Sequence, residues 1–458
     1  MPTKHSPGTT YPIRVIGIYA THWRYRKHTP SAQPGFELGL LEEFHHLFQD
    51  QLPRVLFHEW VPVQMLAFAP PGRPTVKVTE ITNAEFWLFV LPSDQVVAAV
   101  ALGFPSPDLN EDPTLVVKIL EFCAYSQIMI SDFKLLDHIR RRAGKVSAEE
   151  IDNTDNTDKA ISLPPERHQI VLAPKFPGKE PPSQDVMKRI LYRINPPYRQ
   201  EFMPLALPSG LNQEESTFGA VTTYVSLLSG HEKFVDDSVF LTTVQAVGTA
   251  ARFRQIWHAA HQNVRTFRET GQARRVGEQR RADLEELVDE LGNLELDLSF
   301  SVETSADLGL LIPSLRIESF HRALYRVMEL PTRASTVSQM FVRLDSSVRS
   351  ELRAIDIRER REEEEKRLHG AIAVSVLSVI GVPLGFIVAF FGINATEVDN
   401  KLSLFDFSHY LIAYIIAGVL AMIPVIVFFF LHRKTWRRAR EDVRRRLTAA
   451  FRPRSSSP

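Results

Sequence analysis

Two charge-free apolar stretches near the C-terminus constrain this chain more than any other feature of its sequence. The first runs from Gly370 to Asn394 and the second from Tyr410 to Leu431. Each is long enough, at roughly 20 residues or more, to cross the ~30 Å hydrocarbon core of a bilayer as a helix. The connector between them is too short for a folded domain. We therefore predict a large body that is attached to a two-helix membrane hairpin.

Charges on the two sides of the second stretch predict its orientation. The tail, residues 433–458, is strongly basic and contains only Glu441 and Asp442 as acidic residues. Acidic residues dominate the connector, where Lys401 is opposed by Glu397, Asp399 and Asp406. Positive residues stay on the cytoplasmic side, so we expect a multi-pass protein of the plasma (inner) membrane with both termini in the cytoplasm. The single cysteine, Cys123, fits a reducing compartment.

The residues before position 231 predict an α/β or α+β domain. Short β-rich runs separated by turn residues are expected at 11–19, 55–68, 75–91 and 95–102. A short helix is expected at 39–51. A longer one is expected from Asp112, as N-cap, and Pro113 towards Arg142, ending at Gly144. Residues 145–185, rich in proline and acidic residues, predict a linker with one embedded strand, His168 to Leu172.

Helical periodicity follows in residues 231–334. One helix is expected from Asp236 to Glu269, and a second from Arg281 to Leu298 has leucines at alternating steps of three and four. A proline-bounded segment that includes Pro313 and Pro331 then precedes a stalk helix, residues 335–369. We expect that stalk to continue unbroken into the first apolar stretch.

Small residues form one face of the first apolar stretch on a helical wheel. They recur at steps of three and four: Ala371, Ser375, Ser378, Val382, Gly385, Ala389 and Gly392. Such a face allows helices to approach closely in lipid, so it fits either a packing face or a narrow pore lining. Neither apolar stretch, Gly370 to Asn394 or Tyr410 to Leu431, contains an Asp, Glu, Lys, Arg or His residue. This argues against a proton-coupled pump whose coupling residues lie in the bilayer.

The membrane region resembles the CorA-type two-span cation transporters. The resemblance rests on Pro383-Leu384-Gly385, on Phe391-Gly392-Ile393-Asn394, on the acidic connector 395–409 and on the basic tail, and it covers about Ser335 to Trp436. The usual family motif is Tyr-Gly-Met-Asn, and here Ile393 stands in place of the methionine. Gly385 replaces a common threonine, and the family's conserved segment at the inner mouth is absent.

This resemblance implies a homopentameric funnel whose first spans line the pore. It implies that Gly392, Ile393 and Asn394 form a selectivity filter and that Pro383 bends the helix. The proposed pore lining is then Ser375, Ser378, Val382, Gly385 and Ala389. The outer acidic residues Glu397, Asp399 and Asp406 would raise the local cation concentration. The transported divalent cation is left open among Mg²⁺, Zn²⁺, Ni²⁺ and Co²⁺.

Other chemistries have little support in the sequence. The chain contains none of the common phosphate-loop, nucleophile-elbow or zinc-protease motifs, so we expect neither an enzyme nor a bound cofactor. His258 and His261 lie one turn apart, but a solvated helix face explains them better than a metal site. The basic tail fits an anchor to anionic lipid rather than a nucleic-acid site.

Three functions remain open from the sequence. The first is a CorA-like homo-oligomeric channel for divalent cations. The second is a CorA-like effector channel, opened by a small signalling ligand that binds the cytoplasmic domain. The third is a non-conducting, membrane-anchored scaffold joined through the leucine seam.

Overall fold

A computed structural model describes most of the chain. The described residues are 13–25, 52–105, 112–146, 148–150, 162–174, 183–194, 205–272, 277–311 and 314–394, with separate helical positions between 411 and 426. The chain divides into two compact units, Met1–Ser350 and Glu351–Pro458. The expected helix at 39–51 lies outside the described residues, as do parts of the expected linker.

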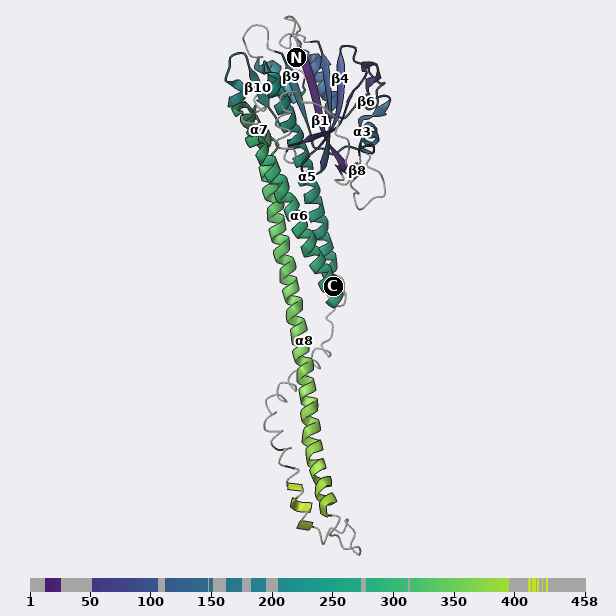
Figure 1. Ribbon diagram of the computed structural model, residues 1–458, viewed down its shortest axis with the longest axis vertical. Coiled ribbons are helices and arrows are strands. Elements are labelled where there is room, and N and C mark those ends of the chain that lie inside the picture. Colours follow the sequence, from purple (N-terminus) through teal and green to yellow (C-terminus); the bar gives the residue numbers. More distant parts are fainter. Residues whose placement is uncertain are drawn as a thin grey trace, which may run out of the picture. The chain divides into compact units, whose positions relative to one another are not determined.

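An eight-stranded mixed sheet organises the first unit (Figure 1). In spatial order its strands are β10 (Phe218–Val221), β11 (Val225–Ser229), β9 (Arg167–Ala173), β1 (Ile13–Tyr25), β5 (Gln95–Phe104), β4 (Asn83–Val90) and β2 (Arg54–Trp60), and β8 (Ala148–Glu150) pairs with the end of β1. Only β9 and β11 pair in parallel; the other pairs are antiparallel. This mixed sheet, followed by long helices, confirms the expected α/β class.

Both faces of the sheet are covered. All ten residues of β5 are buried, which explains why its sequence shows no polar alternation. Helix α5 (Lys233–Gln272) packs on one face, against β1, β5 and β9. Helices α2 (Thr114–Ala124) and α4 (Gln184–Tyr192) pack on strands β1, β9 and β11, and their buried residues share a hydrophobic cluster with Ile13, Val15 and Tyr19.

The long helix expected from residue 112 to residue 144 is wrong. Helix α2 ends at Ala124, and α3 (Leu135–Ala143) begins only after two short strands, β6 (Ile128–Ile130) and β7 (Phe133–Lys134). Together with β3 (Leu66–Phe68), which follows the 3-10 turn η2 (Val63–Met65), these strands form a second, three-stranded sheet. Ser126, Ser131 and Asp132 adopt left-handed φ angles at the breaks, so the helix cannot continue there.

The segment expected to be a linker supplies a central strand. The expected strand His168–Leu172 is confirmed within β9, but β9 lies between β1 and β11 in the middle of the sheet. Its five residues from His168 to Leu172 are all buried. Residues 145–185 are therefore only partly linker, because a strand so placed belongs to the core.

The helices that follow the sheet, α5 to α8, form the helical half of the chain, and their positions match the periodicity of the sequence closely. Helix α5 contains the expected helix 236–269, and α6 (Gly277–Leu311) contains the leucine seam, of which Leu284, Leu287, Leu291 and Leu298 are buried. Helices α5 and α6 pack on each other, and α7 (Leu315–Val327), which contacts both of them, also packs on the 3-10 turn η4 (Ser209–Asn212). Helix α8 (Leu330–Asn394) is continuous and begins five residues earlier than expected, because Pro331 occupies its first turn.

A close approach between α5 and the sheet makes a specific prediction. A Cβ atom on Gly248 would lie 2.3 Å from Leu91 Cδ2 and 3.0 Å from Val97 Cγ2, whereas a Cβ on Gly292 in α6 would meet nothing within 4 Å. We expect Gly248→Ala to destabilise the protein by about 1–3 kcal/mol through overpacking. Gly292→Ala, the matched control, should stabilise it by about 0.5–1 kcal/mol through helix propensity. Thermal unfolding of both variants, followed by tryptophan fluorescence, measures this; equal shifts would contradict the packing of α5.

Candidate functional site

The sequence-predicted pore segment forms the last part of α8. Its backbone is helical throughout, from Gly370 to Asn394, and the helix ends at Asn394. In the single chain, Ser378, Gly385 and Ala389 are exposed and Ser375 is half-buried. The side chains of Val382, Pro383, Gly392, Ile393 and Asn394 lie outside the described residues, as do Glu397, Asp399 and Asp406. The arrangement of the predicted filter and of the acidic connector therefore stays a prediction from the sequence.

The described part of the chain contains no helix with the length and apolar character needed to cross a bilayer. Many side chains of the first predicted span, and most residues of the second, lie outside that part.

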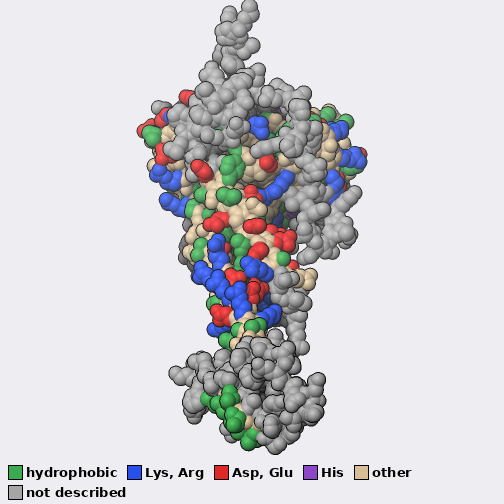
Figure 2. All heavy atoms as spheres, turned by 60° about the horizontal axis from the view of Figure 1, so that its bottom comes forward, with side chains coloured by type: hydrophobic (Ala, Val, Ile, Leu, Met, Phe, Trp, Pro, Cys, Tyr) green, Lys and Arg blue, Asp and Glu red, His purple; other side chains and the backbone are tan. Residues whose placement is uncertain are grey.

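Exposed apolar side chains gather in the second unit. Ile412 is 74% exposed and Val374 is 65% exposed. The other large exposed apolar residues at its described helical positions are Ile357, Leu368, Leu411, Ile415, Ile416, Val419, Met422 and Ile426. Figure 2 shows a group of exposed hydrophobic side chains at the bottom of the view. Groups of exposed apolar side chains are typical of surfaces that contact lipid or another protein.

Helix α8 changes character along its length. Val337, Phe341, Leu344 and Val348 are buried, as the sequence predicts, whereas every residue from 361 to 370 is exposed. That exposed segment contains the four consecutive glutamates 362–365 and the weak ion pair between Arg367 and Glu363, whose N–O distance is 4.0 Å. Exposed pairs of this kind contribute little to stability. Residues 361–370 therefore form a charged, solvent-exposed segment of the helix in the single chain.

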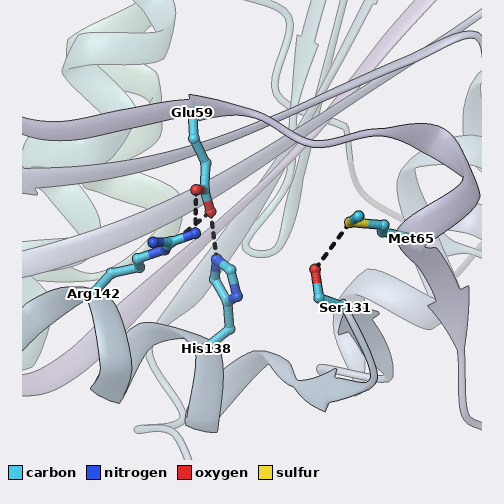
Figure 3. Close-up of polar contacts among 5 residues, drawn as sticks. All are labelled: Glu59, Met65, Ser131, His138 and Arg142. Carbon is cyan, nitrogen blue, oxygen red and sulfur yellow. Dashed lines mark hydrogen bonds and ion pairs between the residues drawn. The ribbon is translucent and has the colours of Figure 1, made fainter.

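A partly buried ion-pair cluster attaches α3 to the sheet (Figure 3). Glu59 on β2 accepts a 2.6 Å hydrogen bond from His138 Nε2, a 3.2 Å bond from Arg142 Nε, and another from Arg142 Nη2. Burial alone would raise the pKa of Glu59, but the bonds from His138 and Arg142 outweigh it, and the pKa is lowered. Beside the cluster, Ser131 Oγ donates to Met65 Sδ at 3.3 Å.

Near the start of α5, two adjacent carboxyl groups have raised pKa values, in contrast to the lowered pKa of Glu59. Burial raises the pKa of Asp236 to about 7, and the charge of Asp237 adds to this shift while Arg14 opposes it. Burial also raises the pKa of Asp237 to about 6; Lys233 and Arg14 oppose the shift, and Glu85 adds to it. The Asp236 carboxyl therefore titrates near neutral pH, and the Asp237 carboxyl holds its proton mainly below about pH 6.

No metal site emerges from the described residues, which contain no group of three or more His, Cys, Asp or Glu side chains placed to hold an ion. His258 and His261 lie on an exposed stretch of α5, where the His261 ring stacks on Trp257 at a centroid distance of 5.3 Å. His45 and His46 lie outside the described residues. Cys123 is a buried free thiol, as expected.

Sequence reasoning missed both polar clusters of the domain. Glu59 precedes His138 by 79 residues along the chain, and no periodic pattern connects them. Asp236 and Asp237 read as ordinary residues of a helix N-terminal turn, where carboxylates are common. Their common signal, burial, depends on the tertiary fold.

Comparisons of this chain with protein-family models, with curated proteins and with solved structures found no match.

We expect Glu59→Gln to destabilise the first unit by about 1–3 kcal/mol, because it removes a charged acceptor from His138 and Arg142. The lowered pKa makes this contribution present above the ordinary value of 4.5 and lost as the pH falls through the lowered value. Asp345→Asn is the control, since it breaks an exposed 2.8 Å pair with Arg349 and should cost about 0–0.5 kcal/mol. Thermal unfolding at pH 7 and pH 4 compares the two; equal effects at pH 7 would show that the Glu59 cluster is not stabilising.

The raised pKa values of Asp236 and Asp237 predict that the stability of the protein decreases as the pH rises, the opposite of the dependence expected for Glu59. The native carboxyls hold protons that the unfolded chain releases above about pH 4, so stability should fall as the pH rises towards 7. The double variant Asp236→Asn/Asp237→Asn should flatten this slope and gain about 1–3 kcal/mol more at pH 8 than at pH 5, relative to wild type. Melting temperatures across that range test this. A constant difference would show that both carboxyls are ionised in the native state.

Proposed function

We propose that this chain is a homo-oligomeric membrane channel or transporter for divalent cations, of the CorA-like kind. The observation that carries the proposal is the set of exposed apolar side chains in the second unit, from Val374 to Ile426. Lipid covers such a surface without the cost of apolar hydration. Two helices enclose no pore alone, so conduction requires several copies around an axis, and five is the number that the family resemblance implies.

The continuous α8 supports a pore-lining role for the first predicted span. Its backbone keeps the spacing that places Ser375, Ser378, Gly385 and Ala389 on one face. Three of these four residues are exposed in the single chain, so this face is available to neighbouring copies. A face of small residues lets helices approach closely and leaves hydroxyl and backbone oxygens near the axis.

Neutral oxygens suit a hydrated divalent cation. Mg²⁺ gives up its water ligands reluctantly, so a filter that hydrogen-bonds the hydration shell would pass it without binding it tightly. The Asn394 side chain supplies a carbonyl oxygen for this purpose. Carboxylates would hold a divalent ion more firmly, and the span 370–394 contains none.

The decisive experiment is divalent-cation flux into liposomes that contain the purified protein. Wild type should conduct, and Asn394→Gly, which retains a good helix C-terminus, should assemble normally but lose flux or ion preference. Asn293→Gly, the same change on an exposed position of α6, should leave the flux unchanged. Mass photometry in mild detergent checks the assembly. A strictly monomeric particle, or wild-type flux in a correctly assembled Asn394→Gly oligomer, would contradict the proposed filter.

A second candidate is an effector channel that opens when a small ligand binds the first unit. A specific observation favours it over the scaffold: the first unit contains a cavity of about 740 Å³ whose lining includes Lys134, Arg140 and Arg167.

A further inference from the structure

The cavity in the first unit lies where three distant segments meet. It has a volume of about 740 Å³. Its lining comes from Tyr125 and Ser126 just after α2, from positions in and before α3, and from the segment that leads into β9. The positions in and before α3 are Lys134, Leu136, Asp137 and Arg140, and the segment that leads into β9 contributes Ser162, Leu163, Pro164, Pro165 and Arg167. A volume of this size lies within the range of small-molecule sites in proteins, and it suits a ligand of nucleotide size.

The charges that line the cavity are mostly positive. Lys134, Arg140 and Arg167 are opposed only by Asp137, which lies 3.4 Å from Arg140 Nη1. Among the described residues, the side chains of Lys134 and Arg167 have no hydrogen bond or ion pair. Surface cations in native proteins need no partner, but two in one cavity, with a single acid already paired, produce a local positive potential.

A fourth cation, Arg193, interacts with Arg167 but does not line the cavity. Arg193, at the end of α4, contacts the ring of Tyr224 at 5.6 Å, and the charge of Arg167 acts on it unfavourably. Burial lowers the pKa of Arg193, and the repulsion from Arg167 adds to that shift, while the hydroxyl of Tyr125 opposes it.

The uncharged groups of the cavity suit a ring and a polar chain. Tyr125 is 67% exposed although it lines the cavity, so one face of its ring is available for stacking. Ser126 and Ser162 add hydroxyl groups. Arginine guanidinium groups bind phosphate oxygens through paired N–H donors, which lysine supplements as a point charge.

We propose that this cavity binds a phosphate-bearing small molecule of nucleotide size, held by Lys134 and Arg167 and stacked on Tyr125. Binding itself depends only on the first unit. Regulation of cation flux by that ligand rests on the proposed channel function. The ion pairs of Glu59 hold α3 from its opposite face, through His138 and Arg142, and thereby position Asp137 and Arg140 at the cavity.

Isothermal titration of the full-length protein in mild detergent, without divalent cations, tests the site with inorganic pyrophosphate, ADP and adenosine. We expect saturable binding of pyrophosphate and ADP that weakens with added salt, and weaker or no binding of adenosine. Lys134→Gln and Arg167→Gln should each raise the dissociation constant about tenfold, which corresponds to about 1.4 kcal/mol. Tyr125→Ala should weaken ADP but not pyrophosphate.

Arg281→Gln serves as the matched control. Arg281 is an exposed arginine of α6 paired with Glu285 at 2.9 Å, so its loss should leave both dissociation constants unchanged. Melting temperatures of the variants confirm that each one folds. Absence of saturable binding of pyrophosphate and ADP, or equal binding by wild type and the Lys134→Gln/Arg167→Gln double variant, would overturn the site.

Anion binding and cation flux, measured on the same protein, distinguish a failure of the ligand site from a failure of the proposed channel. Anion binding that depends on Lys134 and Arg167, without cation flux in liposomes, would keep the site and overturn the channel. Cation flux with no binding of either anion would do the reverse. Flux that ADP changes in wild type but not in Arg167→Gln would support both.

Discussion

The packing of α5 against the sheet is the contact on which the rest of the first unit depends. This helix buries one face of β1, β5 and β9 and also carries α6, so it joins the sheet to the helical half. Its close approach at Gly248 leaves no room for a side chain. Interiors are packed as densely as organic crystals, so a small change at this contact is transmitted to both halves.

Buried polar groups fix the position of α5 more specifically than apolar packing does. Gln95 on β5 donates to the backbone of β1 at Thr21 and accepts a 3.0 Å hydrogen bond from Gln255. Gln255 in turn accepts from Arg252, which pairs with Asp297 on α6. Each unpaired member of such a chain would incur a desolvation penalty, so a shift of the helix along the sheet is unfavourable.

Helix α3 connects stability to the proposed ligand site in the same manner. One of its faces carries His138 and Arg142, which bond Glu59, and another carries Asp137 and Arg140 at the cavity. Loosening the Glu59 cluster should therefore alter ligand binding as well as stability. The acidic pair at the start of α5 is a separate feature, and its protons tie the stability of the unit to pH.

The sequence by itself determined the features that depend only on residues close together along the chain. The apolar stretches 370–394 and 410–432, the leucine seam of α6 and the unbroken helix α8 all follow from periodicity within a few turns. Only the tertiary structure decided the features that depend on strand pairing and side-chain contacts between distant segments of the chain. It divided the expected helix 112–144, because Ile128–Ile130 pairs with β3, and it placed β9 at the centre of the sheet despite its proline-rich flanks. It also brought Glu59 to His138, and Arg167 to Tyr125 and Lys134, because side chains far apart in sequence meet only when the sheet is assembled.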